Sequence, residues 1–363
     1  MDATDIKITA LRARPVDVPM ARPLHTSGGS VGSAPLVLID LETEAGLTGH
    51  SYVFCYAPWV LAPVAAAVEK MGATLVGDAI DPAAIEDKLQ RSLRLLGAQG
   101  VAMMALAGLD MAVWDAAAKA AGLPLARALG GDIRPIPAYN SNGLGIIGAD
   151  KVGAEASALA APGFTAIKVR LGYPDAAGDV AVVAAVRDAV GPDIELMSDY
   201  NQSLSVADGS ARAEALNDSG LAWIEEPTMF NDYAGHAKIR VASQTPIQIG
   251  ENCWGLPDMR HAVDAGACDF FMADAMKIGG VTGWMRAAAL AERAGLPLSS
   301  HLFPEISAHL LTAAPTAHWL EYVDWASPIL QTPLRIEDGH AIAADTPGTG
   351  ISWDEDAVAR YLV

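Results

Sequence analysis

Three short stretches of the sequence decide the fold: IELMSDYNQS (residues 194–203), LAWIEEPT (221–228) and PIQIGEN (246–252). Each begins with an apolar run of strand length and ends close to an acid, Asp199, Glu225 or Glu251. The acids are 26 residues apart in both steps, which is room for one strand, one helix and their connections. This repeat predicts a parallel sheet in which strands alternate with helices.

Five more stretches between Arg134 and Val323 have the same texture, so the region predicts eight strands. They are PIPAYNS (135–141), FTAIKVR (164–170), DFFMADA (269–275), LPLSSHL (296–302) and AHWLEYV (317–323). The seven segments between the strands, such as 175–190 and 281–294, have the length and composition of amphipathic helices. We therefore expect an α/β fold, a (β/α)7β TIM-type barrel over residues 133–329. A doubly wound open sheet is the rival fold, but no GxGxxG motif follows the first strand.

The first part of the chain, residues 1–132, has a mixed pattern that predicts an α+β domain. Strands are expected over residues 6–18 and 35–41, followed by a third that ends near Phe54. The Ala-rich run from Val101 to Ala120 is too long for a strand and predicts a helix. The tail, residues 330–363, has Gly-, Pro- and Asp-rich turns and no further βα unit, so we expect it to pack back on this first domain.

Composition excludes several classes of protein. The 363 residues are 52% hydrophobic and 18% charged, which excludes a disordered chain. The net charge of −19 disfavours nucleic acid and anionic membrane surfaces as partners. Residues 51–68 carry no charge, but Pro58 and Pro63 interrupt them, so a strand running into a helix is expected there rather than a membrane span.

The cysteines and the first residues bear on the compartment. Cys55, Cys253 and Cys268 are odd in number, widely spaced and outside any CxxC motif, so neither a disulfide framework nor a zinc site is expected. The opening MDATDIKITA has acids where a secretory signal carries basic residues. Both features favour a reducing, cytoplasmic compartment.

Asp199, Glu225 and Glu251 predict a metal site. The carboxyl ends of the strands of a parallel barrel meet at one rim, so the three carboxylates are expected to converge. Three anions about 4 Å apart repel by about 4 kcal/mol per pair at an effective dielectric constant of about 20, so the cluster requires a cation. Ligands that offer only oxygen favour Mg²⁺ or Mn²⁺ over zinc. Acids that merely solvate loop ends are the alternative, which three acids in phase disfavour.

The other strand ends carry further candidates for catalysis. Asp274 and His301 end neighbouring strands, where the carboxylate could orient the imidazole as a general base. Lys168 and Arg170 alternate onto the same inward side and could hold a substrate carboxylate or exchange a proton. Glu321 could hydrogen-bond a substrate carboxylate if it keeps its proton, or pair with Lys168. Histidines without such a placement are expected at the surface: His50, His236, His261 and His340.

These residues and the phrases around them resemble the enolase superfamily and, within it, the mandelate racemase subgroup. The matching phrases follow the family's order: HTSGGSVGSAPLVLIDL, SDYNQS, WIEEPT, IGEN, DAMKIGGVTGW, SSHLFPEISAHLL and PTAHWLE. The resemblance covers essentially the whole chain. It implies a capping α+β domain on a (β/α)7β barrel, and Mg²⁺-dependent removal of the α-proton of a 2-hydroxycarboxylate through an ene-diolate. It also implies a small-molecule carboxylate as substrate and a symmetric homo-oligomer.

The resemblance further implies roles for single residues. Asp199, Glu225 and Glu251 correspond to Mg²⁺ ligands, Asp274 and His301 to the dyad that acts as base on one face, Lys168 to the group that neutralises the substrate carboxylate, and Glu321 to a hydrogen-bond donor toward that carboxylate. Ser141 and Asn201 are similar to residues near the metal and the carboxylate. Leu24, Val31 and Tyr56 occupy the positions of the capping loops that close over the distal part of the substrate.

One residue departs from the subgroup's Lys-x-Lys pattern, in which the second lysine is the base on the face opposite the histidine. Arg170 stands there, and a neutral arginine at pH 7 costs about 7 kcal/mol against about 4.6 kcal/mol for lysine. Racemisation requires a base on both faces, so Arg170 favours a one-base reaction. With His301 as that base, loss of a β-hydroxyl leads to a 2-keto acid, as in the acid-sugar dehydratases of the subgroup.

Three alternatives to this reaction remain open. The apolar set of Leu24, Val31 and Tyr56 favours an aryl or aliphatic 2-hydroxy acid and a mandelate-type racemase or epimerase, with Arg170 or Lys168 opposite His301. Arg170 could also bind a second carboxylate, which would favour a diacid. The alternative of another class is a barrel that has kept the fold as a non-catalytic binding protein.

Overall fold

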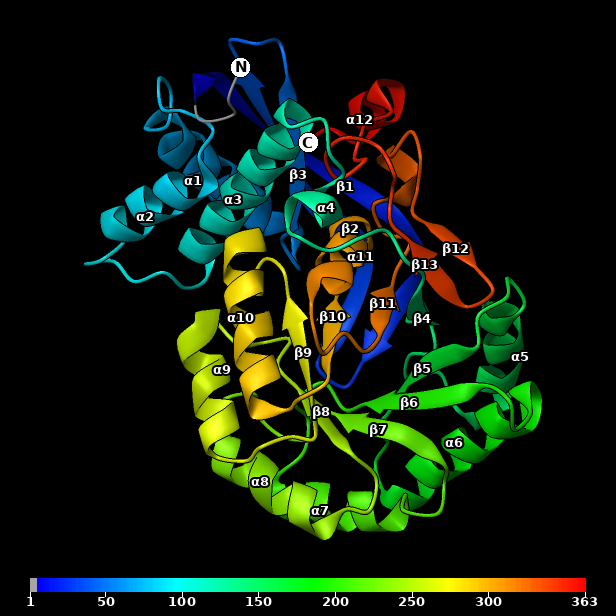
Figure 1. The fold of residues 1–363 in the computed structure, drawn as a ribbon. Coiled ribbons are helices and arrows are strands. Elements are labelled where there is room, and N and C mark those ends of the chain that lie inside the picture. The colour runs from blue at the N-terminus through cyan, green and yellow to red at the C-terminus, as the bar shows by residue number, and fades with distance from the viewer. Residues whose placement is uncertain (1–4) are drawn as a thin grey trace.

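The computed structural model describes residues 5–363, and residues 1–4, with which the predicted first domain begins, lie outside the described residues. The lower part of Figure 1 is a barrel of eight strands. They are β4 (Ile136–Asn140), β5 (Ala166–Arg170), β6 (Glu195–Asp199), β7 (Leu221–Glu225), β8 (Ile247–Ile249), β9 (Phe270–Asp274), β10 (Leu298–His301) and β11 (Leu320–Tyr322). Strands β4 to β10 pair in chain order, and β11 pairs in parallel with β4. A parallel bridge between Leu298 and Ala317 closes the ring between β10 and β11.

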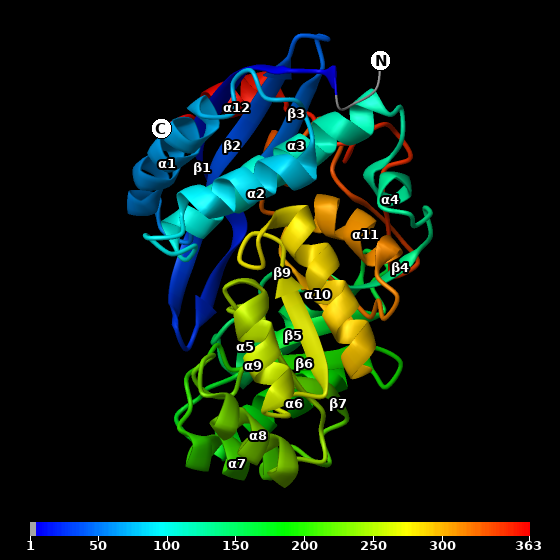
Figure 2. The ribbon, with the colours of Figure 1, turned by 60° about the vertical axis from the view of Figure 1, so that its left-hand side comes forward.

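Seven helices connect these strands and cover the outside of the barrel (Figures 1 and 2). They are α5 (Ala149–Ala160), α6 (Ala176–Val190), α7 (Val206–Ala215), α8 (Tyr233–Ala242), α9 (Gly255–Asp264), α10 (Gly280–Ala294) and α11 (Pro304–Ala313). Helix α10 shows why such segments form: Val281, Trp284, Ala288 and Ala291 recur every three to four residues and are buried on one face. The predicted (β/α)7β barrel is confirmed.

The inside of the barrel is filled by side chains. Met197, Trp223 and Met272 belong to one buried cluster and come from β6, β7 and β9. Side chains alternate along a strand, so the acid two positions after each of these residues also points inward, nearer to the carboxyl end of the strand. The packed interior is therefore the floor on which the strand-end acids lie.

The upper part of Figure 1, which we call the cap, is a three-stranded antiparallel sheet covered by helices. Its elements are β1 (Ile8–Thr26), β2 (Gly29–Thr43), β3 (Thr48–Phe54), a 3-10 turn (Pro58–Val60), α1 (Leu61–Ala73), α2 (Pro82–Ser92), α3 (Val101–Ala120) and α4 (Leu125–Ala128). The uncharged stretch 51–68 is a strand that runs into a helix, as predicted.

Helix α3 is the central helix of the cap. By length and composition it could cross a membrane, but 78% of its most apolar window is buried in the fold. At Gly108 the helix approaches β2 so closely that a Cβ would lie 2.3 Å from Ile39 Cδ1. The apolar composition of α3 is therefore explained by its burial inside the cap.

The tail runs along both parts of the molecule. A 3-10 turn (Ser327–Ile329) precedes it, and its elements are β12 (Arg335–Glu337), β13 (His340–Ile342) and α12 (Glu355–Tyr361). Strand β13 pairs antiparallel with β4 of the barrel, a contact that the sequence did not predict. The chain then contacts the cap, where Trp353 Nε1 donates to Asp40 (2.7 Å) and Arg14 pairs with Glu355 (2.5 Å). The domain boundaries at residues 132 and 330 stay predictions.

The hairpin of β1 and β2 extends from the cap to the carboxyl-end rim of the barrel (Figure 2). Near its turn, Ser27 Oγ donates to the main-chain oxygen of Tyr200 (2.7 Å), a residue that lies directly after β6. The His25 oxygen accepts from Ile146 N–H (2.7 Å), which lies in the loop after β4. The cap therefore covers the rim on which the predicted site lies.

His236 corrects the expectation that the remaining histidines are at the surface. It is fully buried, because it lies on the buried face of α8 with Gly235 and Ile239. Burial lowers the pKa of the imidazole to about 4, so it is neutral at physiological pH. His50 is half-buried, with Nδ1 3.0 Å from the Asp40 carboxylate.

Candidate active site

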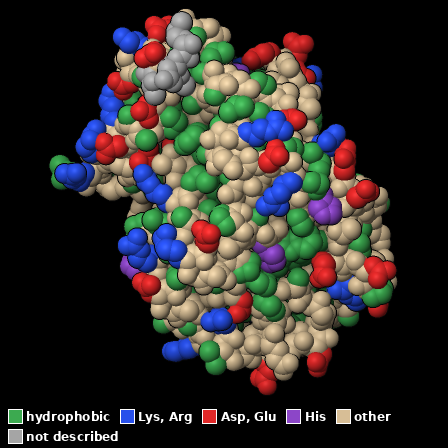
Figure 3. Space-filling model, in the orientation of Figure 1, with side chains coloured by type: hydrophobic (Ala, Val, Ile, Leu, Met, Phe, Trp, Pro, Cys, Tyr) green, Lys and Arg blue, Asp and Glu red, His purple; other side chains and the backbone are tan. Residues whose placement is uncertain are grey.

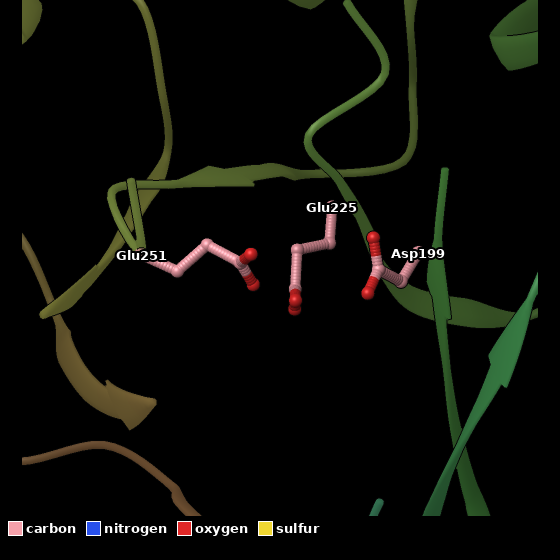
Figure 4. A group of neighbouring side chains, drawn as sticks. All are labelled: Asp199, Glu225 and Glu251. Atoms are coloured by element: carbon pink, nitrogen blue, oxygen red, sulfur yellow. The ribbon is translucent and has the colours of Figure 1, made fainter. Parts of the chain in front are cut away.

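Asp199, Glu225 and Glu251 form the only group of metal-ligating side chains found among residues 5–363. Each offers an oxygen within 4.8 Å of those of the other two, and all three are buried. Figure 4 shows the carboxyl groups of Asp199 and Glu251 pointing toward each other across Glu225. Glu251 follows Gly250, where φ is +127° and a Cβ would lie 2.7 Å from the Met272 oxygen. Only glycine allows the chain to turn here and bring Glu251 to the group.

The chemistry of this group fits a hard divalent cation. Burial raises the pKa of Glu225 to about 8 and also raises that of Asp199, although the neighbouring Lys168 acts in the opposite direction. The carboxylates would therefore gain stability from a further positive charge. All three donors are carboxylate oxygens, which suit Mg²⁺ or Mn²⁺ better than zinc. The residues present fit the metal that the sequence predicts.

Lys168 lies among the acids. Its Nζ is 2.5 Å from Glu225 Oε1, 2.8 Å from Glu321 Oε1 and 3.4 Å from Asp199 Oδ2. Burial alone would lower the pKa of this amine, but the carboxylates raise it above its ordinary value. Lys168 is therefore a fixed cation at the centre of the rim.

Asp274 and His301 lie side by side at the ends of β9 and β10. His301 Nδ1 is 2.7 Å from Asp274 Oδ2, and Asp274 Oδ1 accepts from the N–H groups of Met276 and Lys277. Because the carboxylate accepts on both oxygens, the imidazole carries its proton on Nδ1 and turns Nε2 toward the acids. Nε2 is 3.4 Å from Glu251 Oε2. Burial lowers the pKa of His301, but the surrounding carboxylates outweigh it and raise the pKa to about 9.

Arg170 is buried and does not point freely into the site. Its Nη1 donates to the main-chain oxygens of Ser141 (2.6 Å) and Gly143 (2.9 Å), and its Nη2 donates to Ser141 Oγ (2.8 Å). A guanidinium can only donate, so the Ser141 hydroxyl accepts from it and gives its own hydrogen to Glu321 Oε1 (2.7 Å). Arg170 thus holds the loop after β4 in place.

Glu321 accepts on both oxygens. Its Oε1 accepts hydrogen bonds from Ser141 Oγ and Lys168 Nζ. Its Oε2 accepts from Leu302 N–H (2.9 Å). Burial opposes ionisation, but Lys168 and His301 lower the pKa of this carboxyl below its ordinary value. Of the two roles considered from the sequence, this geometry corresponds to pairing with Lys168 and not to a protonated donor.

Strained backbone marks the same rim. In the described part of the chain, most non-glycine residues with positive φ lie within four residues after a strand of the barrel or the cap: Tyr56, Leu144, Asn201, Gln202, Glu226, Leu302 and Phe303. The strained conformation of Asn201 lets its N–H and Nδ2 donate to the two carboxylate oxygens of Asp199 (2.7 and 2.8 Å). Such residues concentrate at functional sites, where the surrounding structure holds them in place.

The three residues predicted to line the distal part of the site belong to the cap or follow its last strand. Leu24 is buried and lies opposite Val31 across the hairpin of β1 and β2. The Tyr56 and Phe54 rings pack with their centres 4.6 Å apart. Lys277 Nζ lies 4.6 Å from the centre of the Tyr56 ring.

Sequence reasoning missed three polar residues of this rim: Glu226, Asn252 and Lys277. Asn252 Nδ2 donates to Glu251 Oε1 (3.0 Å) and Glu226 Oε2 (2.7 Å), and Lys277 Nζ donates to Asn252 Oδ1 (2.5 Å). A signal was present, because each lies one to three residues after a strand-end acid.

Comparison with protein families identifies the chain. Residues 8–130 match the N-terminal domain of the mandelate racemase / muconate lactonizing enzyme family, and residues 151–357 match the domain described as enolase C-terminal domain-like. The chain belongs to the enolase superfamily, in its mandelate racemase subgroup. The family predicted from the sequence is therefore confirmed.

Enolase-superfamily relatives of this chain carry several activities. The L-talarate/galactarate dehydratase of Salmonella typhimurium is 30% identical, over 89% of this chain and 81% of that protein. The 3,6-anhydro-alpha-L-galactonate cycloisomerase of Streptomyces coelicolor is 33% identical, over 92% and 93%. A solved structure of an enolase from Bradyrhizobium, complexed with magnesium and mandelic acid, is 46% identical, covers 99% of both chains and has a TM-score of 0.94.

Proposed function

We propose that this enolase-superfamily enzyme removes the α-proton of a 2-hydroxycarboxylate with His301 as its single base and dehydrates the substrate to a 2-keto acid. The observation that carries this proposal is the engagement of Arg170 by Ser141 and Gly143. A guanidinium gives up a proton far less readily than an amine, and this one is also held by three hydrogen bonds, so Arg170 is a poor second base.

Mg²⁺ is the cofactor, in keeping with related structures that contain it and with the carboxylate cluster. Asp199, Glu225 and Glu251 would hold it. When bound, it supplies positive charge beside the substrate carboxylate, where negative charge grows as the α-proton leaves.

The remaining work falls to residues of the chain. A cation on the neighbouring carboxylates would lower the raised pKa of His301 and favour its neutral form. In that form His301 Nε2 takes the α-proton, and Asp274 stabilises the resulting imidazolium through Nδ1. Lys168 adds a fixed positive charge near the substrate carboxylate. The bond from the β-carbon to its hydroxyl then breaks, and the hydroxyl leaves as water with the proton that His301 carries. The enol that remains tautomerises to the 2-keto acid, so one histidine serves both proton transfers.

A second candidate is α-proton exchange or racemisation of an aryl 2-hydroxy acid, which lacks a β-hydroxyl. Two observations favour it: the apolar side chains of Leu24, Val31 and Tyr56, and the mandelic acid bound to the Bradyrhizobium structure. In this reaction Lys168 would have to serve the face opposite His301.

Proton NMR in D₂O with Mg²⁺ separates the two candidates. Acid sugars and mandelate-like acids are incubated with the enzyme, and the α-proton and keto-acid signals are followed. New keto-acid signals support dehydration, whereas loss of the α-signal with an unchanged skeleton supports exchange. Turnover of neither panel by Mg²⁺-loaded protein would contradict both candidates.

We also propose a cytoplasmic enzyme that works on small carboxylates as a symmetric homo-oligomer. All three cysteines are free and buried, which supports a reducing compartment. Basic side chains are interspersed with acidic and hydrophobic ones on the face shown in Figure 3. Together with the net charge of −19, this disfavours a nucleic acid partner. The geometry offers no observation that favours the non-catalytic barrel.

A further inference from the structure

Lys277 is a buried cation at the edge of the candidate metal site. It lies in the loop after β9, three residues beyond Asp274, and only 4% of its surface is exposed. Its Nζ lies 4.6 Å from the centre of the Tyr56 ring and 5.9 Å from that of Trp254. Burying an ammonium group is costly unless it is paired, so a lysine in this position requires an explanation.

The hydrogen bond of Lys277 sets the orientation of the Asn252 amide. An ammonium group has donors and no acceptor, so the Asn252 atom that faces Nζ at 2.5 Å must be the oxygen. The Asn252 NH₂ group is therefore directed to the other side, where it donates to Glu226 Oε2 (2.7 Å) and Glu251 Oε1 (3.0 Å).

This orientation leaves the two oxygens of Glu251 with different surroundings. Oε1 is held by Asn252, while Oε2 faces the imidazole of His301 at 3.4 Å. With a reversed amide, the Asn252 oxygen would face two carboxylates and repel them. Lys277 also places a positive charge that acts on both Glu226 and Glu251.

We propose that Lys277 is a positioning residue of the metal centre, which orients Glu251 for Mg²⁺ through Asn252 and ties the capping loop at Tyr56 to that ligand. This inference rests on the proposed function only in placing Mg²⁺ on Glu251. Partners that orient a metal ligand from behind typically contribute about 10- to 100-fold to metal affinity.

The test is Mg²⁺ binding by titration calorimetry, without substrate, on the purified full chain. Lys277→Met keeps an unbranched apolar side chain near the Tyr56 and Trp254 rings and removes the donor and the charge. We expect the Kd for Mg²⁺ to rise about 10- to 100-fold in this variant. Lys238→Met, which removes an exposed lysine of α8, is the control for net charge, and its Kd should equal that of the wild type.

Two further variants separate positioning from general damage to the fold. Lys277→Arg keeps a cationic donor for Asn252 and should restore most of the affinity. Asn252→Leu should weaken Mg²⁺ binding to a similar extent, and adding Lys277→Met to it should weaken binding much less than in the wild-type background.

The outcomes are distinct. Wild-type affinity in Lys277→Met, or fully additive effects of the two substitutions, would overturn the role of Lys277 and leave the proposed function standing. A wild-type protein that does not bind Mg²⁺ would overturn the proposed metal site and this inference with it.

Discussion

Arg170 and Ser141 are joined by two hydrogen bonds, one from Nη1 to the serine main-chain oxygen (2.6 Å) and one from Nη2 to the serine hydroxyl (2.8 Å). This pair explains what the arginine does at a position where the subgroup pattern has a lysine. It anchors the loop after β4 and directs the serine hydrogen to Glu321. In the proposed reaction, the same contacts would keep the guanidinium from acting as a base on the face opposite His301.

Substituting Arg170 by lysine should expose both effects. Lysine ends in one nitrogen and lacks the forked guanidinium that reaches these acceptors from Nη1 and Nη2. Buried oxygens of the β4 loop therefore lose a donor, and the free energy of unfolding should fall by about 1–3 kcal/mol. The amine loses a proton more readily than a guanidinium, so α-proton exchange should rise for the enantiomer that His301 does not serve. Chemical denaturation and proton NMR in D₂O on each enantiomer measure the two changes.

Arg187→Lys is the matched control for that variant. Arg187 Nη1 also donates to two main-chain oxygens, of Gly191 and Ile194, but in the loop that leads into β6, at the other end of the barrel. It should lose stability without a change in exchange. If Arg170→Lys leaves both stability and exchange unchanged, the anchoring role is wrong.

His301→Asn should strongly slow α-proton removal while the fold is kept. The loss of a positioned general base typically lowers the rate by about 10²- to 10⁴-fold. Asp274→Asn should lower kcat as well, because the amide cannot stabilise the imidazolium as a carboxylate does. Single-turnover exchange in D₂O measures both rates. Exchange at the wild-type rate with either enantiomer in His301→Asn would show that another group is the base.

Asp199→Asn should remove the stabilisation by Mg²⁺. A ligand that binds only the folded protein stabilises it by about 2.7 kcal/mol at 100 times its Kd, so the wild-type Tm should rise with Mg²⁺ concentration. In the variant the Tm should not respond to Mg²⁺. Differential scanning calorimetry with and without Mg²⁺ tests this, with Asp193→Asn, an exposed aspartate before β6, as the control. An equal rise in wild type and Asp199→Asn would contradict the metal assignment.

The free energy of unfolding should decrease as the pH is lowered, because His309 takes up a proton. This residue joins α11 to the cap and the tail. Its Nδ1 accepts from Ala126 N–H, and its Nε2 lies 3.1 Å from the Thr349 oxygen, so the ring must be neutral. Burial lowers its pKa to about 4, below the unfolded value of about 6.5. Its contribution is therefore complete above pH 6.5 and is lost as the pH falls toward 4.

Lowering the pH from 8 to 5 should reduce the free energy of unfolding by about 2 kcal/mol through His309 alone. His309→Gln cannot take up the proton, so the fall in unfolding free energy between pH 8 and pH 5 should be smaller in the variant by that amount. Urea denaturation at both pH values measures it. The same pH dependence in wild type and variant would show that His309 is not responsible.

The sequence by itself determined the barrel and the position of the acids on it. Strand number follows from apolar runs and their breakers, which are local features. Asp199 and Glu225 stand at strand ends 26 residues apart, and the closure of parallel strands into a ring leaves such residues one common rim. The hydrogen bond between Asp274 and His301 joins neighbouring strands, so the spacing was sufficient to foresee it.

Only the tertiary structure decided what the cations do. Arg170 finds its acceptors in a loop almost thirty residues earlier, at Ser141 (29 positions) and Gly143 (27 positions). Lys277 combines partners from the cap and from the loop after β8. The alternation along a strand shows on which face a long side chain begins, but its charged group lies several ångströms away from the strand. Where that end binds depends on loops whose paths are set by packing, and those paths are not encoded in any local stretch of sequence.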